Sequence, residues 1–581
     1  MSDNTQVINP AAIPNGDGDI IATDDIGGVK FQRVKVIHGD DGVNDGDASH
    51  ANPLPILLHG RHDSGAIHHL PVTSEGHLEV AIHEPRLPFG AIHTESIHPV
   101  FQVDALYGAN PAMIVETEGL GFDPGPAIGA NSGSSVAANN KFTCSTGTTA
   151  FSFASLQSRS RLRYRPGQGI LVRYASLWST PAADAISVAG VGTAESGFFF
   201  GYNGTNFGIL HSTGGVREVQ TLTITNEATT GGTITLRLNG LDNTVTIPTG
   251  ADPTATAYDI SQQTYSGWSA EQIGSTVVFV AAAVGNKTGT FSLTNGTAVA
   301  TAGTFAETHA GVASTDTWIL QTSWNGDKLD GLGASGVTLD PSMGNVYEID
   351  IQFLGFGSVA FKVEVNAGAT TNNHNVVVVH TLQIPNSQTA TSVSQPSFPF
   401  TMAASSAGST TDVSVSSSCF AGFIEGPSAL VGPRLNYFGT ASSSVTVYTP
   451  LFTIRNDLVY KGRVNQTIIN LLSVSGAAKS NNGLTVFYLI RNATLTGPTS
   501  FGAYSATVSS TYFDNTSTAC TFDTNDQIIW SATTSETGAF NINFLTEDRI
   551  LLQPGETLTL AVQSVTATAV CVGQINTRED Q

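Results

Sequence analysis

The residues best suited to chemistry in this chain are histidines, and ten of the fourteen lie within residues 38–98. His59 and His62 are separated by two residues, and His68 and His69 are adjacent. Side chains two residues apart share a face of a strand, so neither spacing lets one chain chelate a metal well. We therefore expect hydrogen-bonded or solvent-facing histidines and no metal. The alternative is a metal on a three-fold axis, where each copy would supply one ligand.

Carboxylates that lie close together in sequence are the other candidates for catalysis, because glycan hydrolysis uses a carboxylate pair. Such pairs are Asp327 with Asp330 and Glu547 with Asp548. Pairs this close arise by chance, and the coil-by-coil repeat of a parallel β-helix depolymerase is missing. The sequence also lacks a GxSxG elbow, a phosphate loop and an HExxH motif. The Gly/Asp-rich stretch 39–47 departs from the EF-hand template and predicts a solvated turn. We expect no enzyme, no catalytic residue and no cofactor.

Four arginines occupy alternate positions of one segment: Arg159, Arg161, Arg163 and Arg165. On a strand, all four guanidinium groups would project from one face. In a chain of net charge −22, this is a local reversal of sign. The segment is either a solvated strand face or a stripe that docks onto an acidic surface of a neighbouring subunit. As a docking stripe, it predicts that changing all four to Gln weakens assembly and leaves the melting temperature of the domain nearly unchanged.

Composition limits the class of protein. A length of 581 residues predicts several domains. Hydrophobic residues make up 40%, enough for buried cores, whereas charged residues make up only 12%, about half the usual share for a soluble protein. The strong negative charge argues against nucleic acid as a partner, since binding phosphate requires Lys and Arg.

The cysteines and the hydropathy pattern add further limits. The four cysteines are scattered: Cys144, Cys419, Cys520 and Cys571. They predict buried thiols, although Cys520 and Cys571 fall in one expected domain and could pair. The first residues have neither a basic nor an apolar region, and no apolar run is long enough to span a membrane. We expect synthesis in a host cytoplasm without a signal peptide, and export with an assembled particle.

The hydropathy period is two along most of the chain, which predicts an all-β fold. Apolar residues alternate with polar ones at 222–224, 234–238, 484–490 and 558–562. Turn signals such as Asn203-Gly204 and Pro554-Gly555 separate the runs. The best helix candidate begins at Asp252-Pro253, a capping residue followed by proline, and extends to about Tyr265. Many short strands separated by turns favour β-sandwiches.

The chain divides into five parts by composition and pattern. A docking arm, 1–50, precedes a His/Pro-rich range, 51–140, whose short strands have no evident core. These strands would lie on another domain or on another copy of the chain, and we expect them to depend on the oligomer. The remaining parts are one sandwich from 141–214 and 313–426, an inserted mainly-β module at 215–312 with one helix, and a C-terminal β-sandwich at 434–581.

Three places resemble structural proteins of tailed bacteriophages. Residues 20–35 followed by Asn52-Pro-Leu-Pro-Ile resemble the N-terminal segment of virion and tail-associated proteins. Residues 163–169 (Arg-Tyr-Arg-Pro-Gly-Gln-Gly) and 197–205 are similar to a concanavalin-like jelly-roll sandwich, also found in structural proteins of large DNA viruses. The ending, 554–560 with the terminal Arg578-Glu-Asp-Gln, is similar to the last domain of such proteins. The resemblance implies assembly and contact with a host, and it supplies no catalytic residues to carry over.

We therefore expect a virion structural protein in a tail, fibre, baseplate or head-decorating position, with other virion proteins as partners. A homo-oligomer is expected, with three copies favoured by analogy with phage appendages. The alternative function is a host-surface adhesin that binds glycans through the sandwich. Fixed stoichiometry in purified particles would favour the first, and binding of the isolated protein to host cells would favour the second.

Overall fold

The protein is described by a computed structural model. It describes residues 97–580 except 112, 118–131, 194, 298–300, 367–373, 427–431, 480–483, 525–526, 536 and 545–549, and it describes the backbone of six short strands before residue 97. Two compact units are distinguished, 1–86 and 87–581. The six strands belong to the first unit and form three pairs: β1 (Thr5–Val7) with β2 (Asp19–Ile21), β3 (Thr23–Ile26) with β4 (Val29–Gln32), and β5 (His59–Arg61) with β6 (Ile67–His69).

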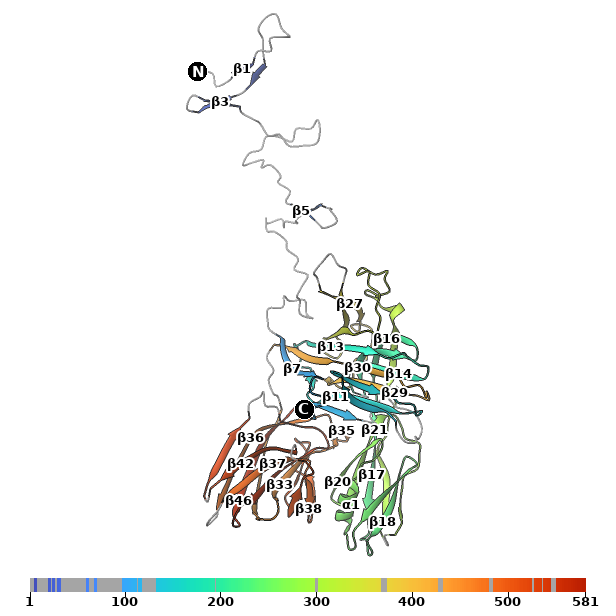
Figure 1. Ribbon diagram of the computed structural model, residues 1–581, viewed down its shortest axis with the longest axis vertical. Coiled ribbons are helices and arrows are strands. Elements are labelled where there is room, and N and C mark those ends of the chain that lie inside the picture. The colour runs from blue at the N-terminus through green and yellow to red at the C-terminus, as the bar shows by residue number, and fades with distance from the viewer. Residues whose placement is uncertain are drawn as a thin grey trace, which may run out of the picture. The chain divides into compact units, whose positions relative to one another are not determined.

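The second unit contains a large sandwich of two antiparallel sheets (Figure 1). The nine-stranded sheet runs β27 (His374–Leu382), β26 (Val359–Asn366), β25 (Asn345–Ile351), β13 (Ile170–Trp178), β30 (Ser414–Ser417), β10 (Lys141–Ser145) and β9 (Ser134–Ala138). Beside this path, β31 (Cys419–Glu425) pairs with β13 and with β7 (Ile97–Asp104). The seven-stranded sheet runs β24 (Thr315–Leu320), β16 (Asn206–Thr213), β15 (Gly197–Asn203), β14 (Ala185–Gly192), β29 (Phe400–Ser406), β11 (Phe153–Ser158) and β8 (Ile114–Thr117).

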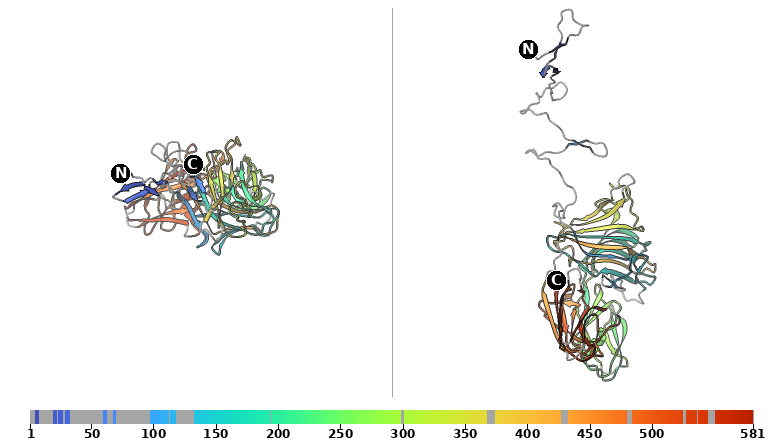
Figure 2. Two further views of the ribbon diagram at one scale, coloured as in Figure 1. Left: turned by 90° about the horizontal axis from the view of Figure 1, so that it is seen from above. Right: turned by 60° about the vertical axis from the view of Figure 1, so that its left-hand side comes forward.

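The core of this sandwich lies between the two sheets and is rich in aromatic side chains. The Tyr174 ring of β13 packs at a tilt against Phe400 of β29, with ring centroids 5.2 Å apart, and its hydroxyl donates to the Ala189 carbonyl of β14, 2.7 Å away. Each sheet combines strands from before and after the inserted segment, as the neighbouring blue-to-teal and yellow-to-orange arrows show (Figure 2). Neither half of the sequence could therefore complete a sheet alone.

The inserted module is a small sandwich with a core of its own. One sheet runs β20 (Trp268–Ile273), β21 (Thr276–Val284), β17 (Arg217–Ile224) and β23 (Gly303–His309), and the other runs β19 (Leu241–Ile247), β18 (Gly232–Leu238) and β22 (Ser292–Asn295). Helix α1 (Pro253–Ser261) begins where the sequence predicts, with the Asp252 carboxylate accepting from the Ala255 N–H at 2.8 Å. It ends four residues before Tyr265, and the Tyr265 hydroxyl instead donates to the Ile260 carbonyl.

The C-terminal domain is a second sandwich. Its five-stranded sheet runs β32 (Arg434–Ser442), β46 (Val570–Asp580), β36 (Ile468–Lys479) and β43 (Ala539–Asn543), with β44 (Leu551–Leu552) beside β36. Its six-stranded sheet runs β39 (Gly502–Ala503), β40 (Thr511–Asp514), β33 (Thr449–Asn456), β45 (Thr557–Ser564), β37 (Thr485–Arg491) and β42 (Ile528–Thr534). Short pairs complete the second unit: β12 (Leu162–Arg163) with β28 (Ser397–Phe398), β34 (Val459–Tyr460) with β35 (Arg463–Val464), and β38 (Thr494–Thr496) with β41 (Ala519–Thr521).

The prediction of an all-β, multi-domain sandwich protein is confirmed. Of the range 51–140, β7, β8 and β9 pair with strands of the large sandwich, that is, with another domain of the same chain. Their open edges find partners in the same chain, so this part does not need a second copy to form sheets. Oligomer dependence stays a prediction for the rest of that range. No helix in the described part of the chain is long and apolar enough to cross a membrane.

Candidate assembly interface

The arginine segment, residues 159–165, lies where the large sandwich meets the C-terminal domain. It is not one long strand, because β11 ends at Ser158 and only Leu162 and Arg163 are paired, through β28. Leu162 and Tyr164 are buried in the core of the sandwich. Three of the four arginines reach residues of the C-terminal domain.

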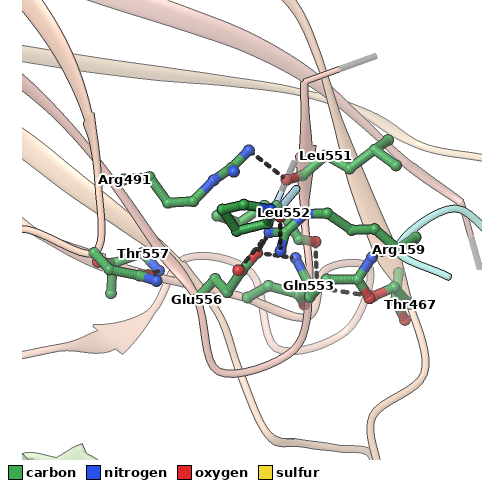
Figure 3. A network of polar contacts seen from close by, with 11 residues as sticks. Arg159, Thr467, Arg491, Leu551, Leu552, Gln553, Glu556 and Thr557 are labelled. Carbon is green, nitrogen blue, oxygen red and sulfur yellow. Dashed lines mark hydrogen bonds and ion pairs between the residues drawn. The ribbon is translucent and has the colours of Figure 1, made fainter. Parts of the chain in front are cut away.

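Arg159 makes the most enclosed of these contacts. Its Nη2 donates to both carboxylate oxygens of Glu556, in the turn between β44 and β45, while its Nη1 donates to the Pro111 carbonyl at 3.3 Å. Gln553 binds both partners: its Nε2 donates to the Arg159 carbonyl at 2.5 Å, and its backbone N–H donates to the Glu556 carboxylate at 2.8 Å. Figure 3 shows Arg159, Gln553 and Glu556 directed toward one another, with Arg491 nearby. Burial, together with the charge of Arg159, lowers the pKa of Arg491.

Arg161 connects three parts of the chain. Its Nη1 donates to the Oε1 of Gln466, whose Nε2 donates to Glu195 at 2.9 Å. Glu195 lies between β14 and β15 of the large sandwich and also accepts from Arg217, the first residue of the inserted module's β17, at 2.9 Å. Burial, followed by repulsion from Arg217, lowers the pKa of Arg161 to about 10, so this guanidinium stays charged at neutral pH.

Arg163 contacts the last strand of the C-terminal domain. It donates to the Asp580 carbonyl and lies 3.6 Å from the Asp580 carboxylate. Burial lowers the pKa of Arg163, while Asp580 acts in the opposite direction. Arg165 has no carboxylate partner among the residues that the structure describes. Three of the four arginines thus bind the C-terminal domain of their own chain. Docking of the segment onto an acidic surface of another subunit stays a prediction.

A second boundary joins the inserted module to the C-terminal domain; the two are drawn in green and in orange to red (Figure 1). Val219, Val278 and Val280 of the module pack in one apolar cluster with Leu458. On helix α1, the Tyr258 hydroxyl donates to the Leu495 carbonyl at 3.2 Å and accepts from its N–H at 2.8 Å.

Charged side chains are buried beside this cluster. Glu271 of β20 accepts from the Leu458 N–H at 2.8 Å and lies 3.5 Å from Arg455 Nε. Arg455, in β33, in turn donates to Asp457 at 2.8 Å. The three side chains are no more than 5% exposed. We call Glu271, Arg455 and Asp457 the boundary triad.

The other sequence candidates have different outcomes. His59 pairs with His69, and His68 with Gly60, in the backbone of β5 and β6, whose side chains are not described, and His62 lies outside the described residues. Asp327 and Asp330 accept backbone N–H groups of their own loop, at Leu329 and Leu332, so they stabilise turns. Glu547 and Asp548 lie outside the described residues. Where the structure describes the chain, it places no three His, Cys, Asp or Glu side chains together as metal ligands.

The partners of the arginines were missed by sequence reasoning. Glu556 follows the predicted turn Pro554-Gly555, and nothing in that pattern indicates its partner. A usable signal exists for the boundary triad: Arg455 and Asp457 interrupt the apolar run 451–460. Charged residues inside a strand that is otherwise apolar must be paired if the strand is buried.

Comparisons with known proteins add little. No family model matches the chain, and no curated protein matches it. Among solved structures, the Faustovirus major capsid protein aligns over 82% of this chain and 91% of its own length, with 9% identity and a TM-score of 0.11.

Proposed function

We propose that this chain is a non-enzymatic structural subunit of a tailed-phage particle that acts by assembling with other virion proteins. One observation carries most weight: contacts of Arg159, Arg161 and Arg163 fasten the large sandwich to the C-terminal domain. A building block needs domains fixed in this way. The N-terminal resemblance to phage virion proteins supports the phage assignment and a tail, fibre, baseplate or head-decorating position.

Exposed apolar side chains supply surface for such assembly, because isolated proteins rarely keep them grouped in water. One group lies at an end of the C-terminal sandwich, where the Val565 N–H donates to the Leu484 carbonyl and the Ser564 N–H donates to the Ser444 carbonyl. Its members are 41–64% exposed: Val445, Val447, Leu484, Val565 and Val570. We extend the proposal to a homo-oligomer, with three copies favoured, located in the virion.

Quantitative mass spectrometry of purified particles tests this function. A structural subunit should be present at one fixed ratio to the major capsid protein in every preparation, and immuno-electron microscopy should give its position. Absence from washed particles would refute the proposal. Binding of the purified chain to host cells that is lost when surface glycans are stripped would instead favour the adhesin. Release of oligosaccharides from the host envelope would show an enzyme.

A further inference from the structure

The boundary triad holds two carboxyl groups against one guanidinium. Arg455 Nε and Nη2 lie 3.2 Å and 2.8 Å from Asp457 Oδ1, and Nε lies 3.5 Å from Glu271 Oε2. The guanidinium also lies over the Phe501 ring, 4.4 Å from its centroid. With both carboxyls ionised, the triad would carry a net negative charge in a buried place, which is strongly unfavourable.

Each carboxyl also keeps one oxygen unsatisfied. Glu271 Oε1 and Asp457 Oδ2 are buried and receive no hydrogen bond from any N–H or hydroxyl group that the structure describes. Both carboxyl groups contact the same Arg455 guanidinium, and the charge of Asp457 disfavours ionisation of Glu271. One proton held by the two carboxyl groups would make the triad neutral. Two carboxyl groups that share a site in this way keep one proton to higher pH than either would alone.

Burial of the triad also favours the protonated form of its carboxyl groups. Burial raises the pKa of Glu271 well above its usual value, and the charge of Asp457 adds to this, while Arg455 and the Leu458 N–H oppose it. Burial also raises the pKa of Asp457. From β40, Tyr512 faces Arg455 with its ring centroid 5.5 Å away, and burial raises its pKa, so it stays neutral. From α1, burial likewise raises the pKa of Tyr258, to about 12.

We propose that Glu271 and Asp457 share one proton across this boundary, and that losing the proton as pH rises releases the inserted module from the C-terminal domain. The boundary is suited to open as a unit, because the module has a core of its own around Trp268 and Phe279. A cavity of about 190 Å³ lies at the boundary, lined by Glu271 and Arg455 among others, and gives water a short path to the triad.

The direction of the effect follows from linkage. In an opened boundary, Glu271 would titrate near its usual value of 4.5, and in the closed boundary it titrates higher. At a pH between these two pKa values, the closed form therefore holds more protons than the open form. The stability of the closed boundary is greatest at a pH below the usual pKa of Glu271, falls as pH rises, and is lowest above the raised pKa. One proton changes the opening equilibrium by at most about tenfold per pH unit.

Hydrogen–deuterium exchange on the full chain tests the proposal. Protection factors, corrected for the intrinsic effect of pH on exchange, would be followed from about pH 5 to about pH 9. The reporters are peptides that contain Leu458, whose N–H donates to Glu271, and Leu495, whose N–H donates to Tyr258. Their protection should fall with pH by up to about tenfold per unit. Peptides from the core of the large sandwich, such as β13, should show no such fall.

Two variants complete the test. Glu271→Gln carries no ionisable group and can still donate to Asp457, so its boundary should stay protected across the whole range. Asp259→Asn is the matched control: burial raises the pKa of Asp259 on α1 to about 6, but this residue is not part of the triad. It should keep the wild-type pH profile at the boundary. A wild-type profile without pH dependence would overturn the proposal, as would a Glu271→Gln profile identical to wild type. The wild-type result alone decides if the variant fails to fold.

Discussion

Arg159 and Glu556 form an ion pair in which Nη2 donates to both carboxylate oxygens, although the two residues lie 397 positions apart in the chain. Their side chains are 6% and 17% exposed, so water solvates the pair only partly. Paired, the two charges satisfy each other. Left alone, either would be an uncompensated charge at the interface between two domains, which costs far more than a surface pair gains.

Removing one partner of this pair should therefore destabilise the protein. Arg159→Met or Glu556→Met alone should lower the free energy of unfolding by about 2–4 kcal/mol, slightly below the range for a fully enclosed pair. The double variant should be less destabilised than the sum of the two single variants, because neither Arg159 nor Glu556 is then left without the other. Chemical denaturation of the four proteins gives the coupling energy.

The matched control for this cycle is an exposed pair. Arg237 and Asp242 in the inserted module are 44% and 50% exposed. Arg237→Met should leave the denaturation midpoint unchanged within error. A midpoint for Arg159→Met that equals that of the control would show that the domain interface is not held by this pair.

The quadruple change of Arg159, Arg161, Arg163 and Arg165 to Gln now has a different expected outcome. As a stripe facing another subunit, the segment would leave the melting temperature nearly unchanged. With three arginines bound to the C-terminal domain, the variant should melt earlier than wild type, even as a dilute monomer. Because the contacts are buried, the difference should change little from about 0.1 M to about 1 M salt. An unchanged melting temperature with weakened assembly would restore the docking stripe.

The fold class could be predicted from the sequence because it follows from local patterns, namely the alternation of apolar residues and the turn signals between strands. Leu222, Ile234 and Leu560 lie on the buried faces that their alternation predicts. The Asn203-Gly204 turn joins β15 and β16, with Gly204 in the left-handed region at φ 57°. The alternation at 484–490 does not identify the face of β37 that enters the main core: Phe487 and Leu489 enter it, and Tyr488 faces a smaller cluster. Both faces of this strand are covered, and a period of two cannot rank them.

The contacts between domains could not be predicted from such local patterns. The alternation of the arginines predicts that they share a side, but their partners come from turns and strand ends far along the chain. Pairing of Arg159 with Glu556, or of Arg455 with Glu271, is set by how whole domains pack. No local spacing encodes such contacts, whereas charged residues within an apolar run indicate at least that a partner exists.

Excision of the inserted module is the third prediction. Replacing residues 216–310 with a short Gly/Ser linker should leave the large sandwich with a cooperative melt, since its sheets contain no strand of the module. The C-terminal domain should melt earlier, because Leu458 loses its apolar neighbours and Arg455 loses Glu271. Calorimetry of the full chain and the excised chain resolves the two transitions. Loss of the sandwich transition would contradict the prediction, and an unchanged C-terminal transition would contradict the boundary contacts.

Thiol reactivity provides the last prediction. None of the four cysteines forms a disulfide in the structure; Cys419 is exposed, whereas Cys144, Cys520 and Cys571 are buried. Burial raises the pKa of Cys520 to about 12 and also raises that of Cys571, so neither forms the reactive thiolate near neutral pH. Cys520 and Cys571 also belong to different apolar clusters, which argues against the disulfide that their shared domain leaves open.

At about pH 8, a thiol reagent should therefore modify one cysteine per native chain and all four after denaturation. Cys419→Ser should abolish the native reaction and leave three thiols in the denatured chain. Titration without reductant separates the alternatives. Two thiols in the denatured wild-type chain, rising to four on reduction, would reveal a disulfide, whereas more than one in the native chain would show that a domain boundary opens in solution.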